Sequence, residues 1–212
     1  MADGMAKKSE WYVIQVRTGS ERRMCDLIAK TVEVHNAATA FEDMIRLEEC
    51  FSASFMTHKK IHGKYVEVER LLMPGYVVAV TSTPTQLAEV LRGIRAFCRI
   101  LAVGDRYIPL AGPERAWLEE TTKVNARLLP MSFGFKVGDT LTVTKGPLQG
   151  YEAIISRVDR ENSLAHVEVH VGPMTVKATV GLGILPEQRL INARNQGEDP
   201  FPEPSDHDSH PS

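Results

Sequence analysis

Residues 135–155 read FKVGDTLTVTKGPLQGYEAII, and this stretch decides how the C-terminal part of the chain is interpreted. Leu141, Val143 and Ile154 alternate with more polar neighbours, which is the period-2 pattern of half-buried β-strands. Gly146 and Pro147 lie between the two apolar runs. Glycine permits a positive φ and proline fixes φ at about −65°, so the chain can reverse there. The stretch therefore predicts a strand, a turn and a second strand.

The same kind of pattern continues to the C-terminal side of this stretch. Short strands are predicted at 136–144, 151–158, 164–171, 174–180 and 183–186. Five short strands within about 60 residues are typical of a small closed β-barrel, which leaves no exposed sheet edge. The chain beyond this region is rich in proline and acidic residues and poor in apolar ones, and we expect it to be disordered.

The N-terminal half mixes helices and strands instead. An aromatic and β-branched strand at 10–17 is followed by Ser20, a predicted N-cap for a helix that begins at Glu21. Pro74 and Gly75 precede a continuous apolar strand, and Thr83 with Pro84 predicts the start of a helix that ends at Gly93. Further expected elements are an ambiguous second helix within 36–47, strands at 48–56, 65–70, 94–101 and 107–110, and a helix from Pro113.

These elements predict an α+β protein with two folded domains. We expect a disordered N-terminus at 1–9, an α/β sandwich with an antiparallel sheet at 10–122, and a linker at 123–131. A β-barrel at 132–190 and a disordered acidic, proline-rich tail at 191–212 complete the predicted organisation.

Composition restricts the class of protein. The chain has 212 residues, 43% hydrophobic content and a formal charge of −2, which are ordinary values for a soluble globular protein. It contains neither an apolar run of about 20 residues nor the apolar core of a signal peptide. Cys25, Cys50 and Cys98 are too scattered for a zinc site or a disulfide framework. We therefore expect a cytoplasmic protein that has no contact with a membrane.

No catalytic constellation is evident in the sequence, so we expect binding rather than enzymatic activity, with no cofactor and no metal. His166 and His170 lie four residues apart on one predicted strand face, where an exposed surface is preferred over a metal or proton-transfer role. Cys98 lies between Arg95 and Arg99, but a buried, inert thiol is preferred over an activated one.

Positive charge is concentrated locally despite the negative total. Basic clusters occur at Arg17, Arg22 and Arg23, at Lys59, Lys60 and Lys64, and at Arg92, Arg95 and Arg99. The second cluster falls at the predicted tip of a hairpin formed by 65–70 and the strand before it. A basic hairpin tip is usually a solvated loop and sometimes a contact site.

Three segments, in this order, resemble the NusG family of transcription elongation factors. Trp11-Tyr12-Val13, followed by Arg17-Thr18-Gly19 and a helix, is similar to that family's opening strand and helix. Met73-Pro74-Gly75-Tyr76-Val77 resembles its F-P-G-Y-V segment, with methionine in place of phenylalanine. Residues 135–139, followed by Lys145-Gly146-Pro147-Leu148 and Gly150, resemble its KOW motif. The resemblance covers roughly residues 10 to 190.

Some features resemble a specialised group within the family, the LoaP antiterminators. These features are the basic hairpin 59–64, the segment Tyr107-Ile108-Pro109-Leu110, and the stretches 146–152 and 181–184. Two departures are that 159–163 lacks the more basic run expected in that group, and that Gly183 stands where a glutamate is usual.

The resemblance implies an N-terminal NGN-type domain and a C-terminal KOW SH3-like barrel. It implies a non-enzymatic monomer that binds both large subunits of bacterial RNA polymerase, bridges the cleft and promotes processive elongation or antitermination, at selected operons. The alternatives are a housekeeping elongation factor that couples transcription to translation or termination, and a ribosome-associated RNA-binding protein, for which a more basic chain is expected.

The resemblance also assigns roles to individual residues. The residues that match the patch docking on the polymerase clamp are Gln15, Tyr76, Val78 and Phe97. The cross-cleft contact matches Ser82, Thr83 and Thr85, and contact with non-template DNA is expected of Arg17, Arg22 and Arg23. The barrel is expected to contact a nascent RNA hairpin, a ribosomal protein or a termination factor through Lys145, Arg157, Arg160 and Lys177.

Each assignment has a plainer alternative. Tyr76 and Phe97 are aromatic strand residues of the kind that usually lie in a core. Thr83 is an N-cap whatever else it does, and Arg22 and Arg23 are also typical of a solvated helix face.

Overall fold

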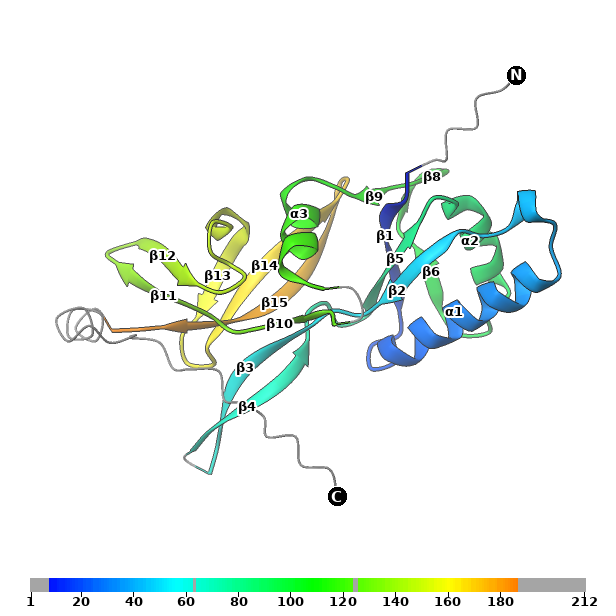
Figure 1. The fold of residues 1–212 in the computed structure, drawn as a ribbon. Coiled ribbons are helices and arrows are strands. Elements are labelled where there is room, and N and C mark those ends of the chain that lie inside the picture. The colour runs from blue at the N-terminus through cyan, green and yellow to red at the C-terminus, as the bar shows by residue number, and fades with distance from the viewer. Residues whose placement is uncertain (1–7, 63, 124–125, 187–212) are drawn as a thin grey trace.

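The computed structural model describes residues 8–62, 64–123 and 126–186. Figure 1 shows a helix-covered sheet in the N-terminal half, a curled sheet in the C-terminal half, and a helix between them. The fold is therefore mixed α+β, as the sequence predicts, with one α/β half and one all-β half. Within the described part of the chain, no helix has both the length and the apolar character needed to cross a membrane.

The N-terminal sheet has the strand order β2-β5-β1-β6, with β9 also paired to β1, and all of these pairs are antiparallel. The bounds are β1 Glu10–Val16, β2 Leu47–Phe51, β5 Tyr76–Thr81, β6 Cys98–Ile100 and β9 Pro109–Leu110. The predicted strands at 10–17 and after Pro74-Gly75 are thus confirmed as the two central strands.

One face of this sheet packs against two helices, α1 (Glu21–Ala37) and α2 (Pro84–Arg92). Tyr12, Ile14 and Val16 alternate onto this face and pack with Met24 and Ile28 of α1, all of them buried. The alternation follows from the pleat of the strand, because successive side chains point to opposite faces.

The opposite face carries Trp11, Val13 and Val78, and it is covered by helix α3 (Gly112–Thr121) and by the C-terminal half. Trp117 of α3 and Val167 of the C-terminal sheet belong to this same buried cluster. We call the cluster the shared core, because both halves of the chain contribute to it.

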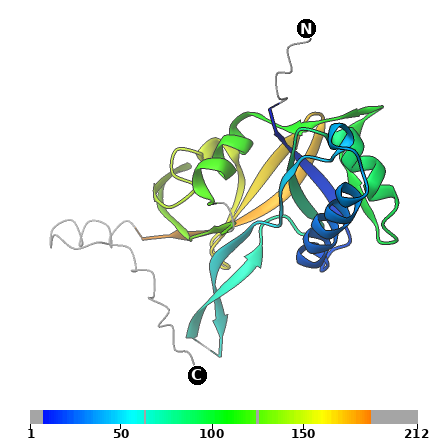
Figure 2. The same cartoon turned by 45° about the vertical axis from the view of Figure 1, so that its right-hand side comes forward.

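The C-terminal sheet has the strand order β12-β11-β15-β14-β13. Its strands are β11 Ser132–Val137, β12 Thr140–Lys145, β13 Ile155–Asp159, β14 Leu164–Val171 and β15 Met174–Ile184, with a 3-10 turn η2 at Glu152–Ile154. Val167, Val169 and Val171 are buried, which confirms the predicted alternation in β14. The sheet curls in both views (Figures 1 and 2), and β11 and β15 pair in parallel.

A long hairpin, β3 (Ser54–Ile61) with β4 (Lys64–Leu71), extends from the junction of the two halves. Its base pairs in parallel with β10 (Leu128–Leu129), which lies within the segment predicted as a linker. The remaining short strands are β7 Ala102–Val103 and β8 Arg106–Tyr107. A hairpin is confirmed, but its bounds differ from the prediction: residues 48–56, predicted as one strand, are divided between β2 and β3, and residues 57–61, predicted as part of the turn, belong to β3. The hairpin projects away from the body in Figures 1 and 2.

Several predicted bounds were wrong. The strand predicted at 94–101 is only three residues long, and the ambiguous helix within 36–47 is the end of α1 followed by the 3-10 turn Phe41–Asp43. Residues 152–154 form η2 instead of strand, because Glu152 turns inward and its carboxylate accepts a hydrogen bond from the backbone N–H of Val143 at 3.1 Å. The strands predicted at 174–180 and 183–186 are one continuous strand, β15.

Candidate functional site

A strip of the sheet face beside the shared core is left uncovered. Gln15 and Tyr76 are direct cross-strand partners, and Arg99 of β6 is paired with Gln15 from the other side. Gln15 and Tyr76 are half-buried, whereas Phe97, just before β6, is 57% exposed. We call Gln15, Tyr76 and Phe97 the docking surface. The exposure of Phe97 excludes the core alternative for that residue in this structure.

Val78 lies on the same face as Tyr76 but is fully buried in the shared core. In this structure it supports the docking surface from the interior and does not lie on its surface. The reason is that α3 and the C-terminal half cover this part of the face, an arrangement that strand alternation alone does not reveal.

The turn before Tyr76 is fixed by a buried carboxylate. Glu21 is 3% exposed, and its Oε1 accepts a hydrogen bond from the backbone N–H of Gly75 at 2.7 Å. Burial acts to raise the pKa of Glu21, but the hydrogen bonds from the backbone N–H groups of Gly75, Glu21 and Gly19 outweigh it, and the pKa is lowered. Gly75 has φ of 86°, a conformation that glycine adopts easily.

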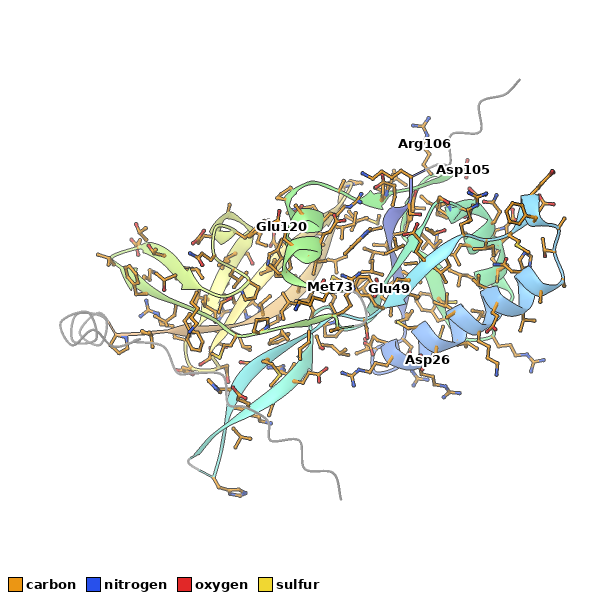
Figure 3. The ribbon with its side chains drawn as sticks, viewed as in Figure 1. Asp26, Glu49, Met73, Asp105, Arg106 and Glu120 are labelled. Carbon is orange, nitrogen blue, oxygen red and sulfur yellow. The ribbon has the colours of Figure 1, made fainter. Side chains whose placement is uncertain are left out.

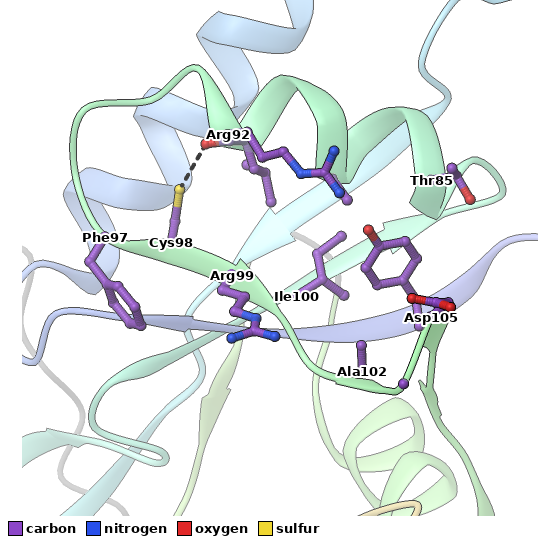
Figure 4. A pocket seen from close by; sticks show the side chains of 12 residues that line it. Thr85, Arg92, Phe97, Cys98, Arg99, Ile100, Ala102 and Asp105 are labelled. Carbon is purple, nitrogen blue, oxygen red and sulfur yellow. Dashed lines mark hydrogen bonds between the residues drawn. The ribbon is translucent and has the colours of Figure 1, made fainter.

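A hollow of about 660 Å³ lies between α2 and the edge strand β6 (Figure 4). Its lining combines buried apolar side chains such as Ile100 with the cations Arg92 from α2 and Arg99 from β6 and with one acid, Asp105. Phe97 lines one end of the hollow. The docking surface therefore continues, through Phe97, into a depression of mixed apolar and charged lining.

The three residues predicted for the cross-cleft contact differ in accessibility. Ser82 is buried at 8% exposure, and Thr83 is half-buried, with its hydroxyl accepting a hydrogen bond from the backbone N–H of Arg46 at 2.9 Å. Thr83 occupies the N-cap position of α2, but its side chain makes no capping hydrogen bond. Thr85 is exposed on the first turn of α2 and lines the same hollow as Phe97.

The arginines predicted for DNA contact gather at the start of α1. Arg17, Arg22 and Arg23 are all exposed, and Arg22 is ion-paired with Glu69 of β4. The pairing lowers the net positive charge that this cluster offers. Ser20 holds the predicted N-cap position of α1, and its hydroxyl bonds the carbonyl of Arg17 instead of capping the helix.

The cations predicted on the barrel fall at two sites. Arg157 and Arg160 line one hollow with Lys136, and Arg157 and Lys177 line a second one on the outer face of β13, β14 and β15. Lys145 lies at the far end of β12, half-buried, and is separate from the other three. Asp159 brings negative charge close to these cations. Hydrogen bonds from Asn162, and then the charge of Arg157, hold the pKa of Asp159 below its ordinary value, so its carboxylate stays charged at neutral pH.

A buried arginine connects the two halves. The Arg127 side chain is 8% exposed, and it makes a two-pronged ion pair with Glu49 of β2, with Nε lying 3.0 Å from Oε1. Its guanidinium also lies over the rings of Phe51 and Trp11, at 4.3 and 5.1 Å from the centroids. In Figure 3, Glu49 and Met73 lie at the junction of the two halves. A two-pronged carboxylate contact and ring stacking are the geometries that arginine favours.

Helix α3 contacts the C-terminal sheet through polar groups as well as through the shared core. The indole N–H of Trp117 donates to the carbonyl of Pro147 at 2.7 Å, within the turn of the 135–155 stretch. Glu114, 6% exposed, lies 2.7 Å from Nδ1 of His170. The Tyr151 hydroxyl donates a hydrogen bond to Glu120. This bond is the main cause of the raised pKa of Tyr151, and desolvation is the second.

Glu21 and Arg127 were not predicted from sequence. Glu21 has an ordinary place in a first helical turn, and Arg127 lies in what looks like a linker. No local pattern distinguishes either residue, since each depends on a partner distant in the chain.

No family model matches the chain. The transcription termination/antitermination protein NusG of Rickettsia typhi is 26% identical over 167 residues, covering 76% of this chain and 81% of that protein. The protein of the same name from Escherichia coli strain K12 is 26% identical over 169 residues, covering 78% of this chain and 89% of that protein.

These relatives support a transcription factor of the NusG family. The chain is also similar to solved structures, among them the following two. "Domain interaction in Thermotoga maritima NusG" has a TM-score of 0.44 at 17% identity and covers 82% of this chain and 94% of that one. "Crystal Structure of MjSpt4:Spt5 complex conformation B" has a TM-score of 0.30 at 12% identity and covers 79% and 90%.

Proposed function

We propose that this NusG-family protein is a non-enzymatic, cytoplasmic factor of transcription elongation and antitermination that binds RNA polymerase through the docking surface. The observation that carries the proposal is the uncovered strip where Gln15 faces Tyr76 and Phe97 is exposed, in a chain whose relatives are named transcription termination/antitermination proteins. An exposed aromatic side chain beside half-buried neighbours is typical of an interface anchor.

The mechanism follows from two contacts at opposite ends of the hollow between α2 and β6 (Figure 4). The docking surface, at the end that carries Phe97, binds the clamp of one large polymerase subunit, and Thr85, at the other end, reaches the second large subunit. A factor that touches both sides binds the closed clamp more tightly than the open one. It therefore shifts the population toward the closed state and disfavours pausing and termination.

The proposed role also includes contacts with nucleic acid and action at selected operons. Arg17 and Arg23 are exposed cations, and their charge supports contact with phosphates of the non-template strand. The barrel cations Arg157, Arg160 and Lys177 lie near one another and support contact with RNA or with an acidic protein surface. We propose action at selected operons, as in the LoaP group that the basic hairpin resembles.

The docking surface is tested by measuring affinity for purified bacterial RNA polymerase core. The variant Phe97→Ala is expected to weaken binding about tenfold or more, the effect of truncating an aromatic anchor. The matched control is Phe41→Ala, since Phe41 is 75% exposed and lies outside the proposed contacts. Equal affinity of the two variants would contradict the proposal.

Operon choice is tested by terminator read-through on templates with and without a leader sequence from the protein's own genomic neighbourhood. A specialised antiterminator increases read-through only when the leader is present. Equal read-through on both templates favours the housekeeping alternative.

A further inference from the structure

Two of the three cysteines meet on the helix-covered side of the N-terminal sheet. Cys25 is a buried residue of α1, and Cys50 is a half-buried residue of β2. Cys25 belongs to the buried cluster between α1 and the sheet, and Cys50 packs against that cluster. A hydrogen bond joins the two side chains. The two sulfur atoms are therefore neighbours in the folded chain, although the residues are distant in the sequence.

The register of the sheet fixes the direction in which Cys50 points. Cys50 is paired with Ala79 of β5, and Ala79 is paired with Tyr12 of β1. Tyr12 packs toward the helices, and side chains that lie directly opposite one another across strands share a face of the sheet. Cys50 therefore points toward α1, while the next residue, Phe51, points into the shared core on the other face.

The third cysteine is not part of this contact. Cys98 lies in β6, and the strand order β2-β5-β1-β6 places three inter-strand spacings between β2 and β6. At about 4.8 Å for each spacing, the two strands are roughly 14 Å apart, whereas the Cα atoms of a disulfide are usually about 4.4–6.8 Å apart. The thiol of Cys98 lies instead 3.6 Å from the carbonyl oxygen of Leu91. Cys98 is thus an internal control for the chemistry of the other two.

We propose that Cys25 and Cys50 are a redox-active pair, which closes to a disulfide when the small thiols around the protein become oxidised. The oxidant is a low-molecular-weight disulfide such as glutathione disulfide. One protein thiolate attacks a sulfur of this disulfide, the S–S bond of the small molecule breaks, and one small thiol leaves. The second protein thiolate then attacks the mixed disulfide and releases the second small thiol. The protein loses two electrons and two protons, and the two small thiols receive them.

The surroundings of the pair make this exchange slow. The hydrogen bond with Cys25, and then burial, raise the pKa of Cys50 well above its ordinary value. The negative charges of Glu49 and Asp26, both labelled in Figure 3, act in the same direction. Little thiolate is present at neutral pH, so the pair responds to sustained oxidation and not to a brief pulse.

The disulfide ties α1 to β2, which is an edge strand of the sheet. It closes residues 25–50 into a loop, and closing a loop restricts the unfolded chain, so the bridged form is the more stable one. Gln15 and Tyr76 of the docking surface lie on the opposite face of the sheet, since Ile14 and Val16 face the helices. The inference goes beyond the proposed function, which uses neither cysteine.

The test equilibrates the full chain in buffers of glutathione and glutathione disulfide at several ratios, once folded and once in urea. Intact mass and peptide mapping measure which cysteines are joined. The folded chain is expected to form the Cys25–Cys50 bridge alone, with an equilibrium constant about 100-fold or more above that in urea. Folding holds the two sulfur atoms in contact, whereas a flexible loop brings them together only at roughly millimolar effective concentration.

The matched control is Cys98→Ser, in which the bridge is expected to form as in the unmodified chain. The bridged form of this variant is expected to unfold at a higher urea concentration than its reduced form, because the coupling between folding and bridge formation is reciprocal. Cys50→Ala is expected to form no internal bridge in the folded state.

Three results would overturn the proposal. The first is a folded chain that stays reduced, or that carries glutathione on single cysteines, in the most oxidising buffer. The second is a bridge in the folded chain that includes Cys98. The third is an equal equilibrium constant in the folded and the urea-unfolded chain, which would show that folding does not bring Cys25 and Cys50 together.

Discussion

At the scale of single residues, Glu21 shows how a buried side chain outside the docking surface fixes the turn beside it. Its carboxylate is held by backbone N–H groups at the turn that leads into Tyr76. The folded state therefore favours the charged form. This stabilisation is complete at neutral pH and is lost as the pH falls from the ordinary glutamate range through the lowered folded pKa.

We predict that Glu21→Gln lowers the free energy of unfolding at pH 7 by about 1–3 kcal/mol, the usual contribution of a hydrogen bond to a charged group. The difference from the unmodified protein is expected to shrink in acid, where the native carboxyl is itself protonated. Urea denaturation at both pH values checks this, with the exposed Glu33→Gln as control. An equal difference at both pH values would show that the charge is irrelevant.

The cysteines give a second prediction at this scale. A hydrogen bond with Cys25, followed by burial, raises the pKa of Cys50 well above its ordinary value, and burial raises the pKa of Cys98. Both groups are therefore neutral thiols at pH 7.5 and are expected to react slowly with iodoacetamide. Mass spectrometry of the native and urea-unfolded chain measures this. Native rates as fast as the unfolded rates would contradict it.

At the scale of elements, β15 depends on glycines for close packing and not for turns. A Cβ at Gly181 would lie 2.1 Å from the carbonyl oxygen of Met56 in β3, and one at Gly183 would lie 2.8 Å from the ring of Phe133. The strand passes directly against the base of the hairpin, and a side chain at position 181 would force the two apart.

Gly181→Ala is therefore expected to lower the free energy of unfolding by about 1–3 kcal/mol through overpacking. Thermal and urea denaturation measure the effect. Thr175→Ala, at an exposed position of the same strand, is the control and is expected to change little. An unchanged stability of Gly181→Ala would mean that β15 does not press on β3 in solution.

These glycines also explain where sequence reasoning succeeded and failed. The starts of α1 and α2 and the alternation of β14 were predictable because each depends on neighbours in the chain. The end of β15 was predicted as a separate strand because Gly181 and Gly183 resemble turn residues. Their real role is set by Met56 and Phe133, which are distant in sequence. The exposure of Phe97 and the burial of Val78 were beyond local patterns for the same reason.

At the scale of the whole molecule, one buried cluster joins the two halves. Trp11 from the N-terminal sheet and Val180 from β15 belong to it, and Trp117 bonds the turn at Pro147. Arg127 and β10 tie the connecting segment to β2 and β3. Contacts of this extent predict that the halves unfold as one unit.

We therefore expect one unfolding transition, with tryptophan fluorescence and far-UV circular dichroism following the same curve. The two tryptophans, Trp11 and Trp117, are both in the shared core, so their fluorescence reports on its opening. Arg127→Ala is expected to lower the free energy of unfolding by about 3 kcal/mol, with both signals shifting together, because it leaves the largely buried Glu49 carboxylate unpaired. Separated transitions would show that the halves are independent.

The shared core also has a consequence while the protein is being made. β15 supplies Val176, Val180 and Leu182 to the core, yet it is synthesised roughly sixty residues after α3. At about 5–20 residues per second, the apolar side of the first half waits several seconds on the ribosome for the strand that covers it. During that interval the nascent chain exposes Trp117 and Leu118, so it is a natural client for a chaperone that binds apolar segments at the ribosome exit.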